Sequence, residues 1–348
     1  MDHRPAALAI VLAIATAACG ASQTSPAAAP MGSTEPGNTV AVSASASTSR
    51  ASATPALART GGTWTTGAST PSRRAENAAV ALDGLIYLAG GLDIHGKTLD
   101  TFESYDPRTD TWTALPPLPA PRDHFGLAPL DGRIYLTGGG EFFTPATRSG
   151  TWSYDPASRR WSALTPMPAK RSQHASVALD GKIYVVGGVV EGADSRALWA
   201  YDPGTGVWQT DLAPMPTERE HLAAVAADGL LIAIGGRKTY QIGAVEAYDP
   251  ATNDWHELPD LPTPRGGSAV GLIGDAIHVA GGENLNAMST YADHEVLDLA
   301  TMTWSKGPDL PTKRHGLASA VVDGRWYVIG GGRAAGLSVS DVVEIFAP

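Results

Sequence analysis

From residue 62 to the C-terminus, short apolar runs alternate with turn residues in a pattern that repeats six times. In the first unit, an apolar run over 78–82 reaches a turn at Asp83-Gly84, and a second run over 85–89 reaches a glycine pair. Asp-Gly between two β-rich runs is a strong signal for a two-residue hairpin. The pattern therefore predicts antiparallel strand pairs. The turn recurs at Asp131-Gly132, Asp180-Gly181, Asp228-Gly229 and Asp323-Gly324, and in inverted order at Gly274-Asp275.

Three further landmarks fix the period of the repeat at 46 to 49 residues. Glycine pairs begin at Gly90, Gly138, Gly187, Gly235, Gly281 and Gly330. Sixteen residues before each pair stands an arginine, at Arg74, Arg122, Arg171, Arg219, Arg265 and Arg314. Ten or eleven residues before each arginine stands a tryptophan, at Trp64, Trp112, Trp161, Trp208, Trp255 and Trp304. A third strand ends in Tyr-Asp-Pro in four units, so each unit has four expected strands.

The glycine doublet, the Tyr-Asp-Pro turn and the tryptophan at these offsets resemble kelch repeats. The resemblance covers residues 62 to 348 and implies an all-β fold, a six-bladed kelch-type β-propeller. The pattern starts with an isolated tryptophan strand over 63–66 and ends with a third strand over 341–346. We therefore expect the N-terminal strand to complete the last blade and close the ring, which removes the open sheet edges. Propellers carry many activities, so the fold alone does not specify a function.

The first sixty residues have a different character. A short polar start precedes an apolar run from Ala6 to Ala18, and Thr16-Ala17-Ala18-Cys19 resembles the lipobox of bacterial lipoproteins. Thirteen apolar residues are too few to span a bilayer but suit an export signal. We expect a signal peptide over 1–18, a disordered tether rich in Ala, Ser and Pro over 19–60, and the propeller over 61–348. Cleavage by an ordinary signal peptidase remains an alternative to lipidation of Cys19.

Composition narrows the class of function. The formal net charge of −10 argues against nucleic-acid binding, because a duplex reader needs a basic face. The single cysteine can form neither an internal disulfide nor a multi-cysteine metal centre. The predicted location is the bacterial cell envelope, on the periplasmic or extracellular side, with a lipid anchor as the only contact with the membrane.

The six arginines are the first candidates for ligand binding. Each precedes the first strand of a hairpin whose second strand ends at the glycine pair, so arginines and glycine pairs share one face, together with the longer loops. Guanidinium groups there would suit carboxylates, phosphates or sulfates. The alternative is that each arginine pairs with a third-strand glutamate. The four such glutamates are Glu103, Glu246, Glu295 and Glu344, whereas units two and three carry Trp152 and Trp199.

Units two and three therefore leave Arg122 and Arg171 without that partner, and both have histidines and aromatic residues nearby in the sequence. His124, His174 and the loop Glu141-Phe142-Phe143 belong to these units, and His221 follows in the next. We expect the ligand site here, at the six arginines with His124, His174, His221, Trp152 and Trp199, while a packing role for each histidine remains open. The nine histidines show no metal motif, so no metal, cofactor or catalytic residue is predicted.

Two functions of different class follow. One is a non-enzymatic binding module that recognises an acidic peptide, a glycan or a small sugar acid at the arginine face. The other is a sugar-acid epimerase or mutarotase, because the chain also resembles the exported kelch-type sialic-acid mutarotases. The kelch-like copper oxidases that act on galactose need a cysteine cross-linked to a tyrosine, and Cys19 lies in the export signal. No Gly-x-Ser-x-Gly elbow or phosphate-binding loop is present.

Overall fold

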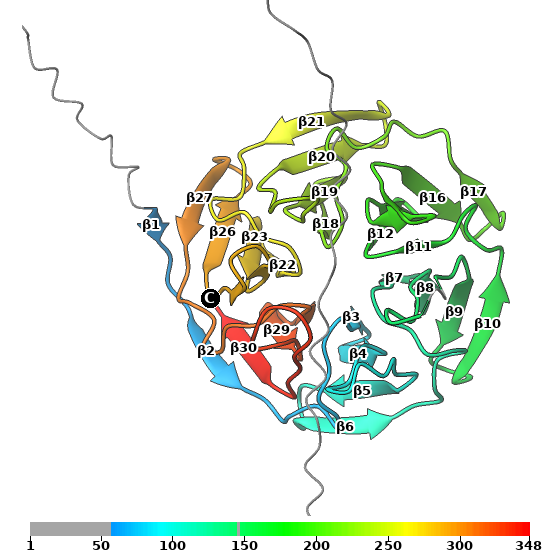
Figure 1. Ribbon diagram of the computed structural model, residues 1–348, viewed down its shortest axis with the longest axis horizontal. Helices are drawn as coiled ribbons and strands as arrows, with labels where there is room; N and C mark the ends of the chain where they lie inside the picture. Colours follow the sequence, from blue (N-terminus) through cyan, green and yellow to red (C-terminus); the bar gives the residue numbers. More distant parts are fainter. Residues whose placement is uncertain (1–56, 145–146) are drawn as a thin grey trace, which may run out of the picture. The chain divides into compact units, whose positions relative to one another are not determined.

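The computed structural model describes residues 57–144 and 147–348, so the predicted signal peptide and nearly all of the predicted tether lie outside the described residues. The described chain forms six blades of four antiparallel strands each, set around a common centre (Figure 1), and one of the six sheets carries a fifth, parallel strand. The innermost strands contact one another in a closed circle, in the order β3, β7, β12, β18, β22 and β28. The predicted all-β, six-bladed kelch propeller is confirmed.

Each blade runs outward from its innermost strand. Blade 1 consists of β3 (Ala78–Leu82), β4 (Leu85–Ala89), β5 (Phe102–Asp106) and β6 (Thr111–Ala114). Blade 2 consists of β7 (Gly126–Leu130), β8 (Arg133–Thr137), β9 (Thr151–Asp155) and β10 (Arg160–Leu164). Blade 3 consists of β12 (Ala175–Leu179), β13 (Lys182–Val186), β16 (Leu198–Asp202) and β17 (Val207–Gln209).

The second half of the circle repeats this plan. Blade 4 consists of β18 (Ala223–Ala227), β19 (Leu230–Ile234), β20 (Val245–Asp249) and β21 (Asp254–Leu258). Blade 5 consists of β22 (Ala269–Ile273), β23 (Ala276–Ala280), β26 (His294–Asp298) and β27 (Thr303–Lys306). Blade 6 consists of β28 (Ala318–Val322), β29 (Arg325–Ile329), β30 (Val343–Ala347) and β2 (Thr63–Thr66).

Short pairings decorate the blades. The loops add β11 (Arg171–Ser172), β14 (Val189–Val190) and β15 (Ala193–Asp194), and the hairpin of β24 (Glu283–Asn284) with β25 (Ser289–Thr290). β1 (Ala58–Arg59), within the segment predicted as tether, pairs in parallel with β27. In the described residues, no helix is long and apolar enough to cross a membrane.

The N-terminal strand closes the propeller as predicted. β2 pairs antiparallel with β30, with Trp64 opposite Phe346, so the outer strand of the last blade comes from the start of the folded chain (Figure 1). The two aromatic rings lie 5.2 Å apart, and Trp64 also contacts Trp326 in the same blade. The closure therefore combines backbone hydrogen bonds with a buried aromatic contact.

The glycine pairs are explained by contact between neighbouring blades. The amide of Gly91 donates to the carbonyl of Arg122 at 2.8 Å, and the equivalent bond recurs at all six boundaries, up to Gly331 and Arg74. Gly90 and Gly91 have φ of 54° and 102°, and a Cβ on Gly90 would lie 2.4 Å from the same carbonyl. Only glycine permits both this backbone conformation and this approach.

Five of the six repeated tryptophans join the outer strands of neighbouring blades, whereas the indole N–H of Trp161 has no hydrogen-bond partner among the described residues. The indole N–H of Trp112 donates to the Ala68 carbonyl at 2.9 Å, and Trp64, Trp208, Trp255 and Trp304 make equivalent bonds to carbonyls of the preceding blade. Apolar side chains fill the space between blades in clusters that combine two adjacent sheets. The repeat landmarks of the sequence therefore correspond to contacts between blades.

Candidate functional site at the channel mouth

A closed ring of six backbone hydrogen bonds surrounds the centre of the propeller. Its members stand two residues after each repeat arginine and are Glu76, His124, Gln173, His221, Gly267 and Gly316, which we call the axial ring. Each amide donates to the carbonyl of the ring member in the preceding blade, at 2.8 to 3.2 Å. The ring thus fixes six side-chain positions around the channel.

All six members of the axial ring have left-handed backbone conformations, with φ between 50° and 65°. Blades 5 and 6 place glycine there, which adopts this conformation without steric cost. Blades 1 to 4 instead place Glu76, His124, Gln173 and His221. Non-glycine residues held in this region carry strain, and such strain clusters at functional sites.

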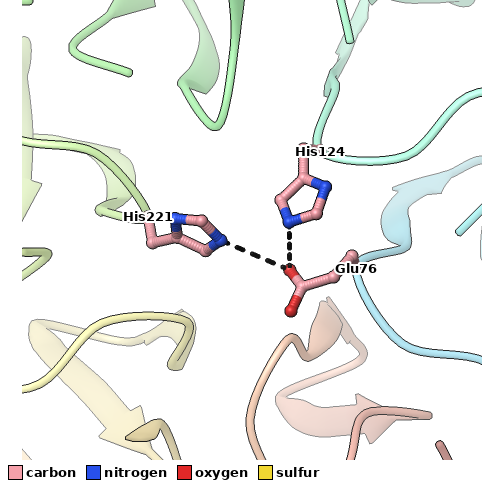
Figure 2. Close-up of side chains that lie close together, drawn as sticks. All are labelled: Glu76, His124 and His221. Atoms are coloured by element: carbon pink, nitrogen blue, oxygen red, sulfur yellow. Dashed lines mark ion pairs between the residues drawn. The ribbon is translucent and has the colours of Figure 1, made fainter. Parts of the chain in front are cut away.

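Four side chains converge above the axial ring. The Nε2 atoms of His124 and His221 lie 3.4 and 3.8 Å from Oε2 of Glu76, as Figure 2 shows. Nε2 of His315, one residue after the arginine of blade 6, lies 3.8 Å from Oε1 of Glu76. Glu76, His124, His221 and His315 form the mouth cluster, with one residue from each of blades 1, 2, 4 and 6.

The other nitrogen of each imidazole faces an acceptor. Nδ1 of His124 lies 2.6 Å from Oδ1 of Asp123, and Nδ1 of His221 contacts Oε2 of Glu220. Nδ1 of His315 lies 3.2 Å from the carbonyl of Gly332. These acceptors hold the rings so that every Nε2 is turned toward Glu76.

Arg237, directly after the glycine pair of blade 4, joins the mouth cluster to two further carboxylates. Its Nε donates to Glu220 at 2.6 Å and its Nη1 contacts Glu283, while Nη2 lies 3.2 Å from the ring nitrogens of His221. Glu283 is also 3.4 Å from Nε2 of His315. Arg237 therefore ties blade 5 to the same cluster.

The surroundings shift the histidines in opposite directions. Burial alone would lower the pKa of His124, but the charges of Glu76 and Asp123 outweigh it and raise that pKa above its ordinary value. Burial, followed by the charge of Arg237, lowers the pKa of His221 well below its ordinary value. Two imidazoles whose ring centroids are 4.9 Å apart thus differ in proton affinity.

A cavity of about 110 Å³ opens above the mouth cluster. Its lining includes the four cluster residues, Arg237 and Glu283, with Phe142, Phe143 and Leu337 around the opening. The ring of Phe142 stacks on His124 with centroids 5.0 Å apart, and Phe142 and Phe143 are 52% and 61% exposed. We call this space the mouth cavity. It combines buried charged groups with exposed aromatic faces.

Other hollows lie near the site, including one of about 130 Å³ whose lining shares Glu76, His124 and His221 with the mouth cavity. A polar hollow of about 290 Å³ lies beside the mouth cavity and shares Phe142 and Arg237 with it, with Lys238, Gln241 and Asn286 among its lining. The central channel, about 470 Å³, is lined by the innermost strands, mostly by small apolar side chains, and its lining includes no acidic, basic or histidine residue. Charge-based chemistry therefore belongs to the mouth cavity and not to the channel.

The structure places the six predicted arginines inside the blades. All are 0 to 3% exposed, so their guanidinium groups do not form an open basic ring at the mouth. Arg74, Arg219, Arg265 and Arg314 pair with the third-strand glutamates Glu103, Glu246, Glu295 and Glu344 at 2.6 to 2.8 Å. The alternative of buried Arg–Glu pairs is what these four blades show, since a buried guanidinium requires a partner.

Blades 2 and 3 satisfy their arginines in other ways. Arg171 lies over the Trp199 ring, 4.4 Å from its centroid, and donates to the carbonyls of Gly187 and Val185. Arg122 donates to the Gly138 carbonyl at 2.6 Å, and burial followed by the charge of Arg148 lowers its pKa to about 10. Trp152 pairs across the sheet with Leu136. These two blades therefore replace the Arg–Glu pair with carbonyl and aromatic contacts.

Of the three predicted histidines, the structure brings His124 and His221 together. His174 is buried below the axial ring, where Nε2 lies 3.0 Å from Oγ1 of Thr137, and burial lowers its pKa to about 3. The predicted lipidation site Cys19 lies outside the described residues. The sequence-based selection missed Glu76, Arg237, Glu283 and His315, although each directly follows a repeat arginine or glycine pair by one or two residues.

The mouth cluster also has a composition that could hold a metal ion. One ligand atom each from Glu76, His124 and His221 lies within 4.8 Å of the others. No metal group was expected from the sequence, because metal motifs are recognised by short spacings and these residues come from three blades. The structure thus brings together donors that no short spacing in the sequence connects.

Comparisons with known proteins agree with the fold. The Kelch motif family matches residues 73–119, and the KLHDC2/KLHL20/DRC7 Kelch-repeats domain matches residues 119–282. The solved structure titled "Structure of YjhT" is similar with a TM-score of 0.67 and 22% sequence identity, over 80% of this chain and 96% of that chain. A search of curated proteins returned no match. Together with the six blades, these matches identify the chain as a kelch-repeat β-propeller protein.

Proposed function

We propose that the mouth cavity is a catalytic site that interconverts the anomers of a small cyclic sugar acid. The observation that carries the proposal is the convergence of carboxylates, imidazoles and one guanidinium in a single cavity at the channel mouth. The resemblance to the kelch-type sialic-acid mutarotases gives the substrate class, and the similarity to YjhT supports the fold on which such a site would be built.

Anomer exchange needs two chemical aids. A base takes the proton of the anomeric hydroxyl while the bond between the anomeric carbon and the ring oxygen breaks, and a cation or proton donor neutralises the ring oxygen. Closure on the other face returns both protons to their first positions. The cavity supplies Glu76 and Glu283 as carboxylates, and Arg237 and His124, whose pKa is raised, as the positive partners. The adjoining polar hollow with Lys238 provides room for the acid group.

The test is proton NMR of a freshly dissolved pure anomer of sialic acid. We expect the protein to accelerate equilibration over buffer, and Glu76→Gln and Glu283→Gln to lower the rate constant by about 10²-fold or more for whichever carboxylate is the base. His256→Ala, on the exposed side of β21, is the matched control and should leave the rate unchanged. Equal rates with wild type and with buffer would disprove the proposal.

A binding role without catalysis is the second candidate. The exposed aromatic residues Phe142, Phe143 and Tyr240 favour it, because sugar rings stack on such faces. The buried arginines give little support to recognition of an acidic peptide. Glycan-array binding that is lost in Phe142→Ala/Phe143→Ala, without acceleration of anomer exchange, would favour this candidate. Binding retained by the double variant would exclude these two faces.

We propose further that the protein acts at the cell envelope after export and lipidation at Cys19. The support is the lipobox-like Thr16-Ala17-Ala18-Cys19, which follows an apolar run of export-signal length. In bacterial cells given a labelled fatty acid, the wild type should incorporate the label and Cys19→Ser should not. Label that persists in Cys19→Ser would contradict the proposal.

A further inference from the structure

We propose that the mouth cluster binds one divalent transition-metal ion, with Zn²⁺ as the best fit, through Glu76, His124 and His221, with His315 beside them. This inference shares its cavity with the proposed sugar chemistry but does not depend on it.

The first argument is that three electron-pair donors, one each from Glu76, His124 and His221, lie within 4.8 Å of one another. If the Nδ1–H groups of His124 and His221 donate outward, each Nε2 carries a lone pair, and both lone pairs are directed at the Glu76 carboxylate (Figure 2). Acceptors 3.4 to 3.8 Å apart need a shared proton or a cation between them. Arg237 lies against the ring of His221, and a metal ion would serve all three donors at once.

The second argument is the pattern of outer partners. Histidine ligands of metals almost always donate their second nitrogen to a carboxylate or a backbone carbonyl, which fixes the tautomer and the ring plane. His124 has Asp123, His221 has Glu220, and His315 has the Gly332 carbonyl. In the described residues, three histidines from three blades thus share the outer arrangement of metal ligands.

The third argument is an excess of buried negative charge. Glu76, Asp123, Glu220 and Glu283 have side-chain exposures of 14%, 2%, 10% and 3%, and Arg237 is the guanidinium among them at 12%. With neutral imidazoles, these four carboxylates and Arg237 together carry a formal charge of −3. Buried charges are usually paired or coordinate a metal, so a divalent cation would compensate this excess.

The fourth argument is that the ligands are fixed by the backbone. Glu76, His124 and His221 belong to the axial ring, whose closed hydrogen bonds hold them in the left-handed conformation. Zinc binds imidazole and carboxylate at about 2.0–2.2 Å, so two ligands of one ion are at most about 4 Å apart. The present separations, within 4.8 Å, require side-chain shifts below about 1 Å to meet that limit.

The donor set identifies the class of ion. Imidazole nitrogens with one carboxylate suit Zn²⁺ and neighbouring transition metals, whereas Ca²⁺ and Mg²⁺ prefer all-oxygen sites. The adjacent mouth cavity leaves one side of the cluster open to a water molecule or a ligand oxygen. An open position is typical of catalytic rather than structural zinc sites. In the proposed anomer exchange the ion would serve as the positive partner, and Glu283 would remain as the base.

The test is metal titration of the full-length protein after treatment with a chelator. Competition titration with Zn²⁺ should show one equivalent bound, and Co²⁺ should give the visible absorption of a low-coordinate nitrogen–oxygen site. Asp123→Ala should weaken Zn²⁺ binding by about 10–100-fold. His124→Ala and His221→Ala should weaken it more, since each removes a ligand. The matched control His256→Ala should bind like the wild type.

Each outcome bears on the inference. Thermal melts of the metal-free variants identify any that fail to fold, and the Co²⁺ spectrum of the wild type gives evidence that needs no variant. Failure of the wild type to bind one equivalent of Zn²⁺ or Co²⁺ would overturn the inference. So would folded His124→Ala and His221→Ala variants that bind Zn²⁺ as tightly as the wild type. One bound equivalent without anomer exchange would leave the metal site standing and refute the proposed function. Exchange by a protein that binds no metal would do the reverse.

Discussion

The repeat arginines and the axial ring differ in residue variation, burial and contacts, although each arginine is only two residues from its ring member. The arginine position is the same in all six blades, buried, and satisfied within its own blade. The axial position varies from glutamate to histidine, glutamine and glycine, and faces the mouth cavity in blades 1, 2 and 4. In this propeller, repetition marks packing between strands and blades, and departure from repetition marks the candidate site.

The repeated contacts stabilise the propeller, and we expect closure by β2 to contribute most to that stability. Deletion of residues 61–70 would expose the edge of β30 and the Trp326 and Phe346 rings that Trp64 covers. We expect loss of cooperative unfolding, because an open propeller lacks one of its outer strands. Circular dichroism during heating measures this. A melting temperature equal to that of the full chain would show that closure is dispensable.

The next effect should come from a single repeat arginine. Arg219→Ala leaves Glu246 buried, charged and without its partner at 2.6 Å, so we expect destabilisation by about 3–5 kcal/mol. Urea unfolding at neutral pH measures the change. The double variant Arg219→Ala/Glu246→Leu should recover part of the loss, since it removes the stranded charge. A single-variant loss below about 1 kcal/mol would contradict a structural role for the arginines.

Two buried histidines where blade 5 packs against blade 6 make the stability of the propeller depend on pH. Burial lowers the pKa of His278 to about 3 and of His294 to about 4, and His278 Nδ1 lies 2.9 Å from His294 Nε2. The unfolded chain binds protons near pH 6.5 that the folded chain rejects, so stability is full above pH 6.5 and falls as the pH drops toward 4. We expect a combined loss of roughly 4 kcal/mol by pH 5, about 2 kcal/mol from each histidine.

Urea unfolding at several pH values between 5 and 7.5 isolates this contribution. The variant His278→Gln/His294→Gln should lose stability less steeply than the wild type on acidification, because its side chains at these two positions do not titrate. Parallel pH profiles for the two proteins would assign the acid sensitivity to other groups, such as His174.

The smallest expected effect is the most informative for the axial ring. Glu76→Gly gives blade 1 the residue type that blades 5 and 6 have and removes one of the buried carboxylates. With a chelator present, we expect unfolding free energy to change by less than about 1 kcal/mol, since relief of the left-handed strain offsets the lost contacts. Gln173→Gly is the matched variant outside the mouth cluster. A large destabilisation by Glu76→Gly alone would show that Glu76 is a packing residue.

The sequence predicted the framework well because the framework is repetitive. Glycine pairs, arginines and tryptophans at constant offsets directly encode the contacts between blades, and the missing outer strand of the last unit predicted closure by β2. The buried Arg–Glu pairs of four blades were also among the predicted alternatives. Spacing alone could not decide between buried Arg–Glu pairs and an exposed arginine ring, because it does not determine the direction of the arginine side chains.

The mouth cluster was only partly predictable for the same reason. His124 and His221 could be selected because they are histidines that follow repeat arginines. Glu76 has the same offset in blade 1 but is not a histidine, and His315 stands one residue closer to its arginine in blade 6. Arg237 and Glu283 directly follow glycine pairs, where loops vary. The closed circle of blades brings these positions together, and a comparison of the residues one and two places after each landmark would have identified them.

The parallel pairing of β1 with β27 has a mechanical consequence. A pull at the N-terminal end of the described chain loads the β1–β27 pair, at Ala58 and Arg59, before any force reaches β2. The two-residue pair can yield first, while the longer β2–β30 pairing stays under less tension. In a propeller held by its N-terminal segment, rupture of the β1–β27 pair would absorb the load first. The β2–β30 pairing, which closes the propeller, would then stay intact.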